Sequence, residues 1–248
     1  MTWLALVKAE LRKLRTTRMP WAFAVVLAVI AVVNGIAVVA GTDMDGSKAF
    51  IATAADQQSM MAFAANALMI AGLFGAVVTA REYGHGTVVP MYLAEPRRVR
   101  AASAQLAATA VGGAVLGLLG AAMTIVAMAV TLPTTDYGFL VSAGGVTRVL
   151  AAAAFSGAAG AVLGAGLGVI VRNTGGAVTG AVLVLVVAPP LLVQLASDTA
   201  SWVPSTLANV VSGVTSEVGV VAALGAIAAW AVVPAIVGLW TIERRDVV

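Results

Sequence analysis

Residues 20–40 read PWAFAVVLAVIAVVNGIAVVA, a stretch with no charged side chain. A transmembrane helix needs about 20 predominantly apolar residues, so this stretch predicts a helix that crosses a bilayer. Further stretches of the same kind follow, each bounded by charged residues, Pro or Gly. They cover residues 59–80, 101–130, 149–171, 177–196 and 219–241. We therefore expect an all-α membrane protein with six transmembrane helices, in which residues 1–248 form a single membrane domain.

The composition agrees with a membrane protein. Of the 248 residues, 61% are hydrophobic and 10% are charged, whereas about 25% of the residues of a soluble domain are charged. The mean hydropathy of +1.02 means that more apolar surface is present than a single core of this length hides from water. The absence of Cys and the presence of one His exclude a disulfide framework, a thiolate metal site and a histidine cluster.

The distribution of cationic residues predicts the orientation, because Lys and Arg accumulate in cytoplasmic loops. With the N-terminus inside, only Lys48 and Arg148 of the fourteen Lys and Arg residues lie outside. The twelve inside residues are Lys8, Arg12, Lys13, Arg15, Arg18, Arg81, Arg97, Arg98, Arg100, Arg172, Arg244 and Arg245. We therefore expect both termini in the cytoplasm. The pI near 9.7 then reflects orientation and not nucleic-acid binding, since no basic patch is interleaved with aromatic residues.

Several function classes are disfavoured by what the sequence lacks. No lysine is preceded by glycine, so the chain has no P-loop and is not expected to hydrolyse ATP by itself. Ionisable residues are absent from the interior of the expected spans, which disfavours a proton antiporter. His85 lies in a charged loop and the spans contain no Asp, so an intramembrane serine or aspartyl protease is not expected. We predict that the chain is not an enzyme and holds no cofactor or metal.

Residues 1–18 have the pattern of an amphipathic helix on the inner membrane surface. Lys8, Arg12, Lys13 and Arg15 lie on the polar face of this helix. Apolar residues at helical spacing form the other face: Leu4, Val7, Leu11 and Leu14. The alternative is a positive-inside signal with incidental helicity.

Residues 81–100, between the second and third expected spans, read REYGHGTVVPMYLAEPRRVR. The spacing of Glu82, Gly86-Thr87, Pro96, Arg97 and Arg98 resembles the E-x-x-x-G-T…P-x-R signature of bacterial ABC-2 type transporter permeases. In that family the segment forms a short cytoplasmic coupling helix that docks on a separate ATP-binding subunit. The resemblance implies that these six residues couple the chain to an ATPase.

Two further stretches are similar to the same family. Residues 172–177 (RNTGGA) resemble its short inner turn, and residues 202–205 (WVPS) resemble the outer re-entrant segment, here 197–218. One departure is Gln105, where family members often carry Lys near the start of the third span.

The resemblance implies a subunit of an ATP-driven exporter in the bacterial cytoplasmic membrane. Two ABC ATP-binding subunits with ATP and Mg would energise it, and a second permease copy or a homologous permease would complete it. Membrane lipids are the other expected partner, and the exported substrate would be a drug, antibiotic, peptide or lipid-like molecule.

The residues themselves leave the role of the 81–100 loop open. Glu82 lies at the inner end of a predicted helix, close in sequence to Arg97, Arg98 and Arg100. It is therefore expected to pair with a cation of its own loop or of a partner. The alternative is a solvated turn in which Gly84 and Gly86 break the helix.

Polar residues inside the spans are candidates for a substrate cavity. Asn34, Asn66 and Gln194 fall in the outer half of the first, second and fifth expected spans, and Phe63 lies one turn before Asn66. An amide layer with an aromatic ring is suited to an amphipathic ligand. Interhelical hydrogen bonding by buried amides is the alternative. We expect residues 189–190 (PP) to kink or break the fifth span.

Small residues recur every four positions in the fourth expected span, at Ala152, Ser156, Gly160, Gly164 and Gly168. Such a stripe lets helix backbones approach closely, and we expect it to pack within the subunit.

Two other function classes stay open. An ion-coupled secondary carrier or a channel often has repeat symmetry between its halves, which is not visible here. A non-transporting membrane anchor of a partner complex has no need for polar residues in its outer half.

Overall fold

The computed structural model describes residues 2–44 and 46–244, and the described residues form helices and loops without strands. Six helical segments are long and apolar enough to cross a membrane, which confirms the expected fold class and the number of spans. They are α2 (Met19–Ala40), α3 with α4 (Ala54–Met61, Ala64–Gly84), α6 (Arg98–Thr131), α7 (Ala143–Val171), α8 with η3 and α9 (Thr174–Val182, Leu183–Val187, Ala188–Leu195), and α11 (Val220–Arg244). The shorter elements are α1 (Trp3–Thr16), η1 (Ala49–Ile51), α5 (Val88–Ala94), η2 (Leu132–Thr134), η4 (Ser197–Trp202) and α10 (Pro204–Ser212).

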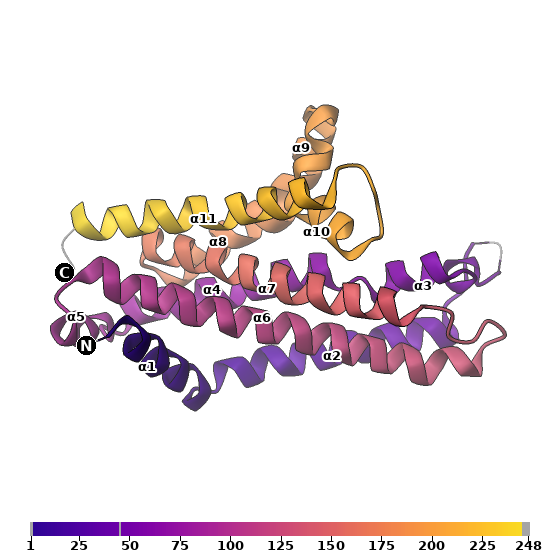
Figure 1. Cartoon of the computed structure of the whole chain (residues 1–248), viewed down its shortest axis with the longest axis horizontal. Coiled ribbons are helices and arrows are strands. Elements are labelled where there is room, and N and C mark those ends of the chain that lie inside the picture. Colours follow the sequence, from indigo (N-terminus) through magenta and orange to yellow (C-terminus); the bar gives the residue numbers. More distant parts are fainter. Residues whose placement is uncertain (1, 45, 245–248) are drawn as a thin grey trace.

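The helices form an elongated bundle with two distinct ends (Figure 1). One end carries α1 and α5 and is called the α5 end here; the other carries α3 and is called the α3 end. Among the described cations, Lys48 and Arg148 belong to segments near the α3 end, and the others to segments at or near the α5 end. Arg245 lies outside the described residues. The side of a membrane that each end faces stays a prediction.

Helix α7 lies at the centre of the bundle and contacts α4, α6 and α11. The small-residue stripe permits this packing. A Cβ atom added at Gly160 would overlap the carbonyl oxygen of Leu68, and one at Gly164 would overlap that of Gly72, both in α4. The predicted packing of the stripe within the chain is therefore confirmed.

Two of the expected spans are not continuous α-helices. The second was predicted over 59–80, but α3 ends at Met61 and α4 begins at Ala64. In the fifth, a π-helical segment, η3, precedes Pro189 and Pro190. Proline has no N–H to donate and its ring clashes with the preceding turn. Helix α9 leaves the direction of α8 and projects from the bundle (Figure 1), so the predicted break is confirmed.

Residues 197–218 do not form an open loop. Helix α10 packs against α4, α7 and α11, and side chains from two other helices cap its C-terminus. Arg148 donates from Nε to the carbonyl of Val211 and from Nη2 to that of Val210, both at 3.0 Å. Gln58 Nε2 donates to the carbonyl of Ser212 at 2.9 Å. A cation is favourable at this negative end of a helix, and the three donors bond to carbonyls of its last turn.

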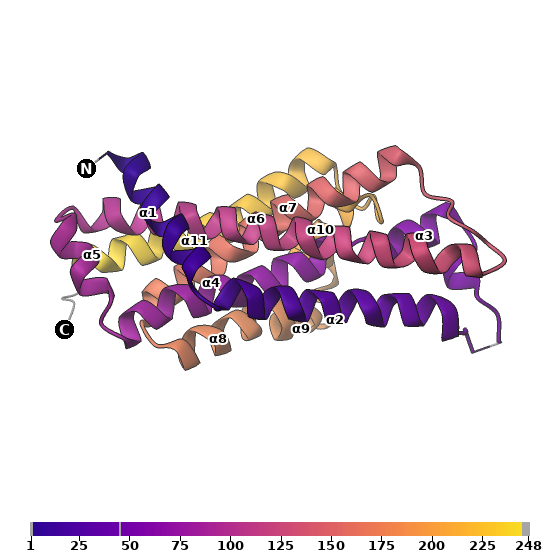
Figure 2. The ribbon, with the colours of Figure 1, turned by 90° about the horizontal axis from the view of Figure 1, so that it is seen from below.

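Helix α1 crosses α6 obliquely before α2 turns along the bundle (Figure 2). The predicted helix is present, and its predicted apolar face is buried or half-buried except at Leu4. Leu14 is buried as predicted, whereas Leu4 is 64% exposed and Leu6 is buried. Val7 and Leu11 are half-buried against the core, and Lys8, Arg12 and Arg15 are exposed. Helix α1 packs against α6, and Lys13 lies at the edge of the bundle with its side chain 38% exposed.

Candidate functional site

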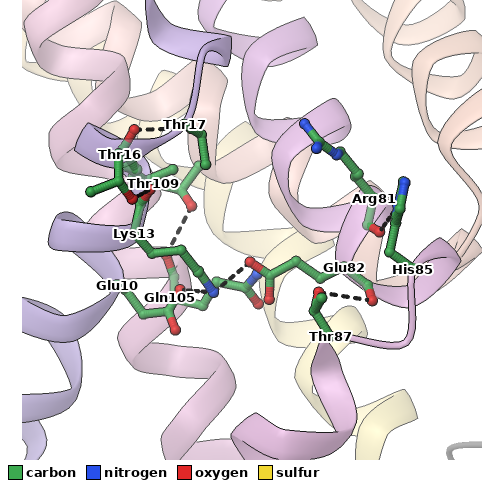
Figure 3. A network of polar contacts seen from close by, with 11 residues as sticks. Glu10, Lys13, Thr16, Thr17, Arg81, Glu82, His85, Thr87, Gln105 and Thr109 are labelled. Carbon is green, nitrogen blue, oxygen red and sulfur yellow. Dashed lines mark hydrogen bonds and ion pairs between the residues drawn. The ribbon is translucent and has the colours of Figure 1, made fainter.

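The α5 end contains a partly buried ion cluster made by residues of α1 and α4 (Figure 3). Lys13 Nζ lies 2.5 Å from Glu82 Oε1 and 2.5 Å from Glu10 Oε2. The side chain of Glu82 is only 9% exposed, and that of Lys13 is 38% exposed. Removing a carboxylate from water is costly unless an opposite charge compensates it, so Lys13 offsets part of the cost of burying Glu82.

Glu82 was expected to pair with a cation of its own loop or of a partner, and among the described residues no cation of its own loop pairs with it. Its partner is Lys13, whereas Arg100 lies 3.7 Å from Glu95. The loop forms helix α5, which separates its arginines from the end of α4, while α1 covers Glu82. The pair is therefore a link between two helices, and not a feature of a solvated turn.

Electrostatics keep Lys13 charged. Burial alone would lower the pKa of Lys13, but the carboxylates of Glu82 and Glu10 together outweigh burial and raise that pKa above its usual 10.5. Next to the pair, the amide of Gln105 lies beside the Glu82 carboxylate (Figure 3). Gln105 is 2% exposed, and its backbone carbonyl accepts a hydrogen bond from Thr109 Oγ1 at 2.8 Å. Glu82 Oε2 has no hydrogen-bond partner among the described residues.

The turn between α4 and α5 depends on Gly86. Its φ is +67°, a backbone conformation that glycine adopts without strain. Thr87 Oγ1 donates to the carbonyl of Glu82 at 3.3 Å, and His85 Nδ1 donates to the carbonyl of Arg81 at 2.9 Å. Gly86 and Thr87 of the sequence motif thus form the turn, and His85 is an exposed turn residue.

Helix α5 has two faces that differ in burial. Val88 is 2% exposed and Tyr92 is half-buried, whereas Val89 and Leu93 are 46% and 79% exposed. Residues four apart share one side of a helix, so α5 is anchored through Val88 and Tyr92 and presents Val89 and Leu93 outward.

A pair of tyrosines anchors α5 to the bundle. The hydroxyls of Tyr83 and Tyr92 are 3.3 Å apart, and burial raises the pKa of Tyr92 above its usual 10.0. Arg172 lies over the Tyr83 ring at 5.5 Å and Arg98 over the Tyr92 ring at 5.9 Å. Cations over aromatic faces are attracted by the ring quadrupole. Movement of α5 is thus linked to α4 and to the residues that begin α6 and follow α7.

The candidate coupling residues are therefore divided by burial. Glu82 and Arg98 hold the segment to the bundle, and Gly86 and Thr87 shape its turn. Pro96 and Arg97 are exposed at the bend before α6, where they are accessible to a partner.

The four candidate cavity residues differ in burial and in hydrogen bonding. Phe63 is 2% exposed, and its ring lies beside Gly120 in the core. Asn34 Nδ2 donates to the carbonyl of Ile30 in its own helix at 2.9 Å. Asn66 on α4 and Gln194 on the projecting α9 are exposed. Among the described residues, no hydrogen bond joins these three amides.

Sequence reasoning missed Glu10 as part of the cluster and placed Lys13 on the solvent face. The available signal was the Glu10-x-x-Lys13 spacing, which pairs opposite charges one turn apart. It also missed Tyr83 and Tyr92. Comparison of the sequence with protein-family models and with curated proteins gives no match. The features that bear on function are therefore the geometry of the α5 end and the sequence motif of residues 81–100.

Proposed function

We propose that the chain is the membrane permease subunit of an ATP-driven ABC exporter, energised by a separate ATPase subunit that docks on α5. The observation that carries this proposal is the exposed apolar face of α5, with Leu93 79% exposed. Exposed apolar surface beyond the membrane-crossing segments is typical of a protein interface. The exposed Arg97 and the motif resemblance support the same docking site.

The contacts of α5 explain how docking would move the membrane helices. A push on α5 reaches α4 through Tyr92 and Tyr83, and it reaches α6 through the Glu95–Arg100 pair. Helix α4 then carries Glu82, which pulls on α1 through Lys13. Because α4 packs backbone-to-backbone against α7, the two helices are expected to shift together as a rigid unit, a common route to inward-open and outward-open states.

The complete exporter in this proposal contains two permease chains and two ATP-binding subunits, which hold ATP and Mg. The α5 end faces the bacterial cytoplasm, and α1 lies at the inner surface of the membrane. The substrate is a drug, antibiotic, peptide or lipid-like molecule. Eleven described cations in or next to segments at the α5 end support this orientation, because cationic loops stay cytoplasmic.

The experiment is co-purification with an ATP-binding subunit encoded beside the chain in its genome. We expect Leu93→Glu to abolish the complex at unchanged membrane abundance, because it places a carboxylate in the apolar contact. Leu4→Glu is the matched control, since Leu4 is also an exposed leucine near the α5 end. An intact complex with Leu93→Glu would contradict docking on α5, and equal loss with both variants would show that any added charge has the same effect.

A further inference from the structure

A cavity of about 250 Å³ lies between α1, the start of α2 and the α4–α5 turn. Its walls are mainly apolar and include Leu14, Met19 and Val78. Its polar and charged lining residues are Lys13, Thr17, Arg81, Glu82, His85 and Thr87. The cavity therefore combines apolar walls with polar groups, the Lys13–Glu82 pair and a further cation, Arg81.

The positive charge of Arg81 is available to a ligand. No carboxylate among the described residues pairs with Arg81, whose side chain is exposed. The neighbouring Lys13 contacts the carboxylates of both Glu82 and Glu10. His85 uses Nδ1 for the carbonyl of Arg81, which leaves Nε2 for another partner. Figure 3 shows the side chains of Arg81 and His85 next to each other and directed away from the Glu82 carboxylate.

The cavity lies at the level where the membrane-crossing helices end. Met19 is the first residue of α2, and Arg81 belongs to the last turn of α4. Lipid headgroups lie at this level, and arginine binds phosphate oxygens through several N–H groups. The volume accommodates roughly eight water-sized groups, which fits a phosphate and the first methylenes of a chain, with the remaining hydrocarbon in the bilayer.

We infer that this cavity binds one anionic amphiphile, a phospholipid whose phosphate pairs with Arg81 and whose hydrocarbon contacts Leu14, Met19 and Val78. Because α1 forms one wall and α4 the other, the bound lipid holds the two helices together beside the Lys13–Glu82 pair. The inference does not depend on the exporter proposal, since a membrane anchor would use the same site.

The test is native mass spectrometry of the purified full chain in detergent, with defined lipids added. We expect one phosphatidylglycerol molecule to stay bound at activation energies that remove phosphatidylcholine. Arg81→Gln should reduce the bound fraction at least tenfold. Arg15→Gln is the matched control, because Arg15 is an exposed cation of α1 that does not line this cavity.

Three results would overturn the inference. One is equal retention of both lipids, because the charge of the headgroup would then be irrelevant. Another is an equal loss with Arg15→Gln, which would indicate general surface attraction. The third is displacement of the lipid by millimolar inorganic phosphate, which would assign the anion site to free phosphate. Retained selectivity with Arg81→Lys would support a charge-based contact.

Discussion

Replacing Lys13 by Met leaves Glu82 buried without the cation that compensates its charge. Loss of one partner from a fully buried pair costs about 3–5 kcal/mol, whereas an exposed pair contributes about 1 kcal/mol or less. Glu82 is 9% and Lys13 38% exposed, so solvent screens part of the attraction. We expect Lys13→Met to lower the free energy of unfolding by about 2 kcal/mol. Glu82→Gln should lower the free energy of unfolding by only about 1 kcal/mol, because Lys13 still pairs with Glu10.

A double-mutant cycle separates the pair from the individual side chains. The double variant should be no less stable than Lys13→Met alone, which corresponds to a coupling energy of roughly 1–2 kcal/mol. The assay is thermal unfolding in detergent followed by tryptophan fluorescence. A loss of about 2 kcal/mol lowers the midpoint by about 4–8 °C. The control is Lys8→Met, at an exposed position of the same helix. It should keep the unfolding midpoint within about 1 °C of the wild-type value. Additive effects of the two single changes would refute the link.

Three further predictions follow from the packing, the turn and the topology. Gly164→Leu should prevent α4 and α7 from packing and sharply reduce the abundance of the protein in membranes. Gly225→Leu, at a helical glycine with open space around it, should not reduce it. Immunoblots of membranes compare the two variants. Gly86→Val should cost about 1–3 kcal/mol through its positive φ, measured as a lower unfolding midpoint, and a midpoint equal to wild type would contradict the strain. A cysteine at Ser47 should react with an impermeant maleimide from outside intact cells and one at Ser103 should not; the reverse pattern would invert the topology.

Much of the bundle is predictable because apolar length and cation placement are strong local signals. Six spans follow from runs such as 20–40, and the break in the fifth follows from Pro189. The gap before Ala64 was missed because no Pro or charge marks it. The orientation of α1 also was not predictable, since a helical pattern identifies a cationic face but not the neighbour that Lys13 meets.

The site was predictable only where local sequence determines it. The glycines at positions 84 and 86 indicate a break in the helix, and α4 ends at Gly84, followed by Gly86 with a φ of +67°. The partner of Glu82 is 69 positions away in sequence and depends on how α1 crosses α6. The amides at positions 34, 66 and 194 were grouped by depth alone. Depth in the membrane does not specify the direction of a side chain, and no hydrogen bond joins these three amides among the described residues.

The most direct test of the central claim is ATP turnover in proteoliposomes that contain the chain, its adjacently encoded ATP-binding subunit, or both. We expect no ATP hydrolysis by the chain alone. The complex should hydrolyse ATP, and this hydrolysis should drive efflux of a candidate substrate. Leu93→Glu should abolish this ATP-driven efflux at equal protein abundance, because it prevents the complex from forming. ATP hydrolysis by the pure chain, or an ATP-binding subunit whose turnover and binding are indifferent to the chain, would contradict the assignment as an exporter permease.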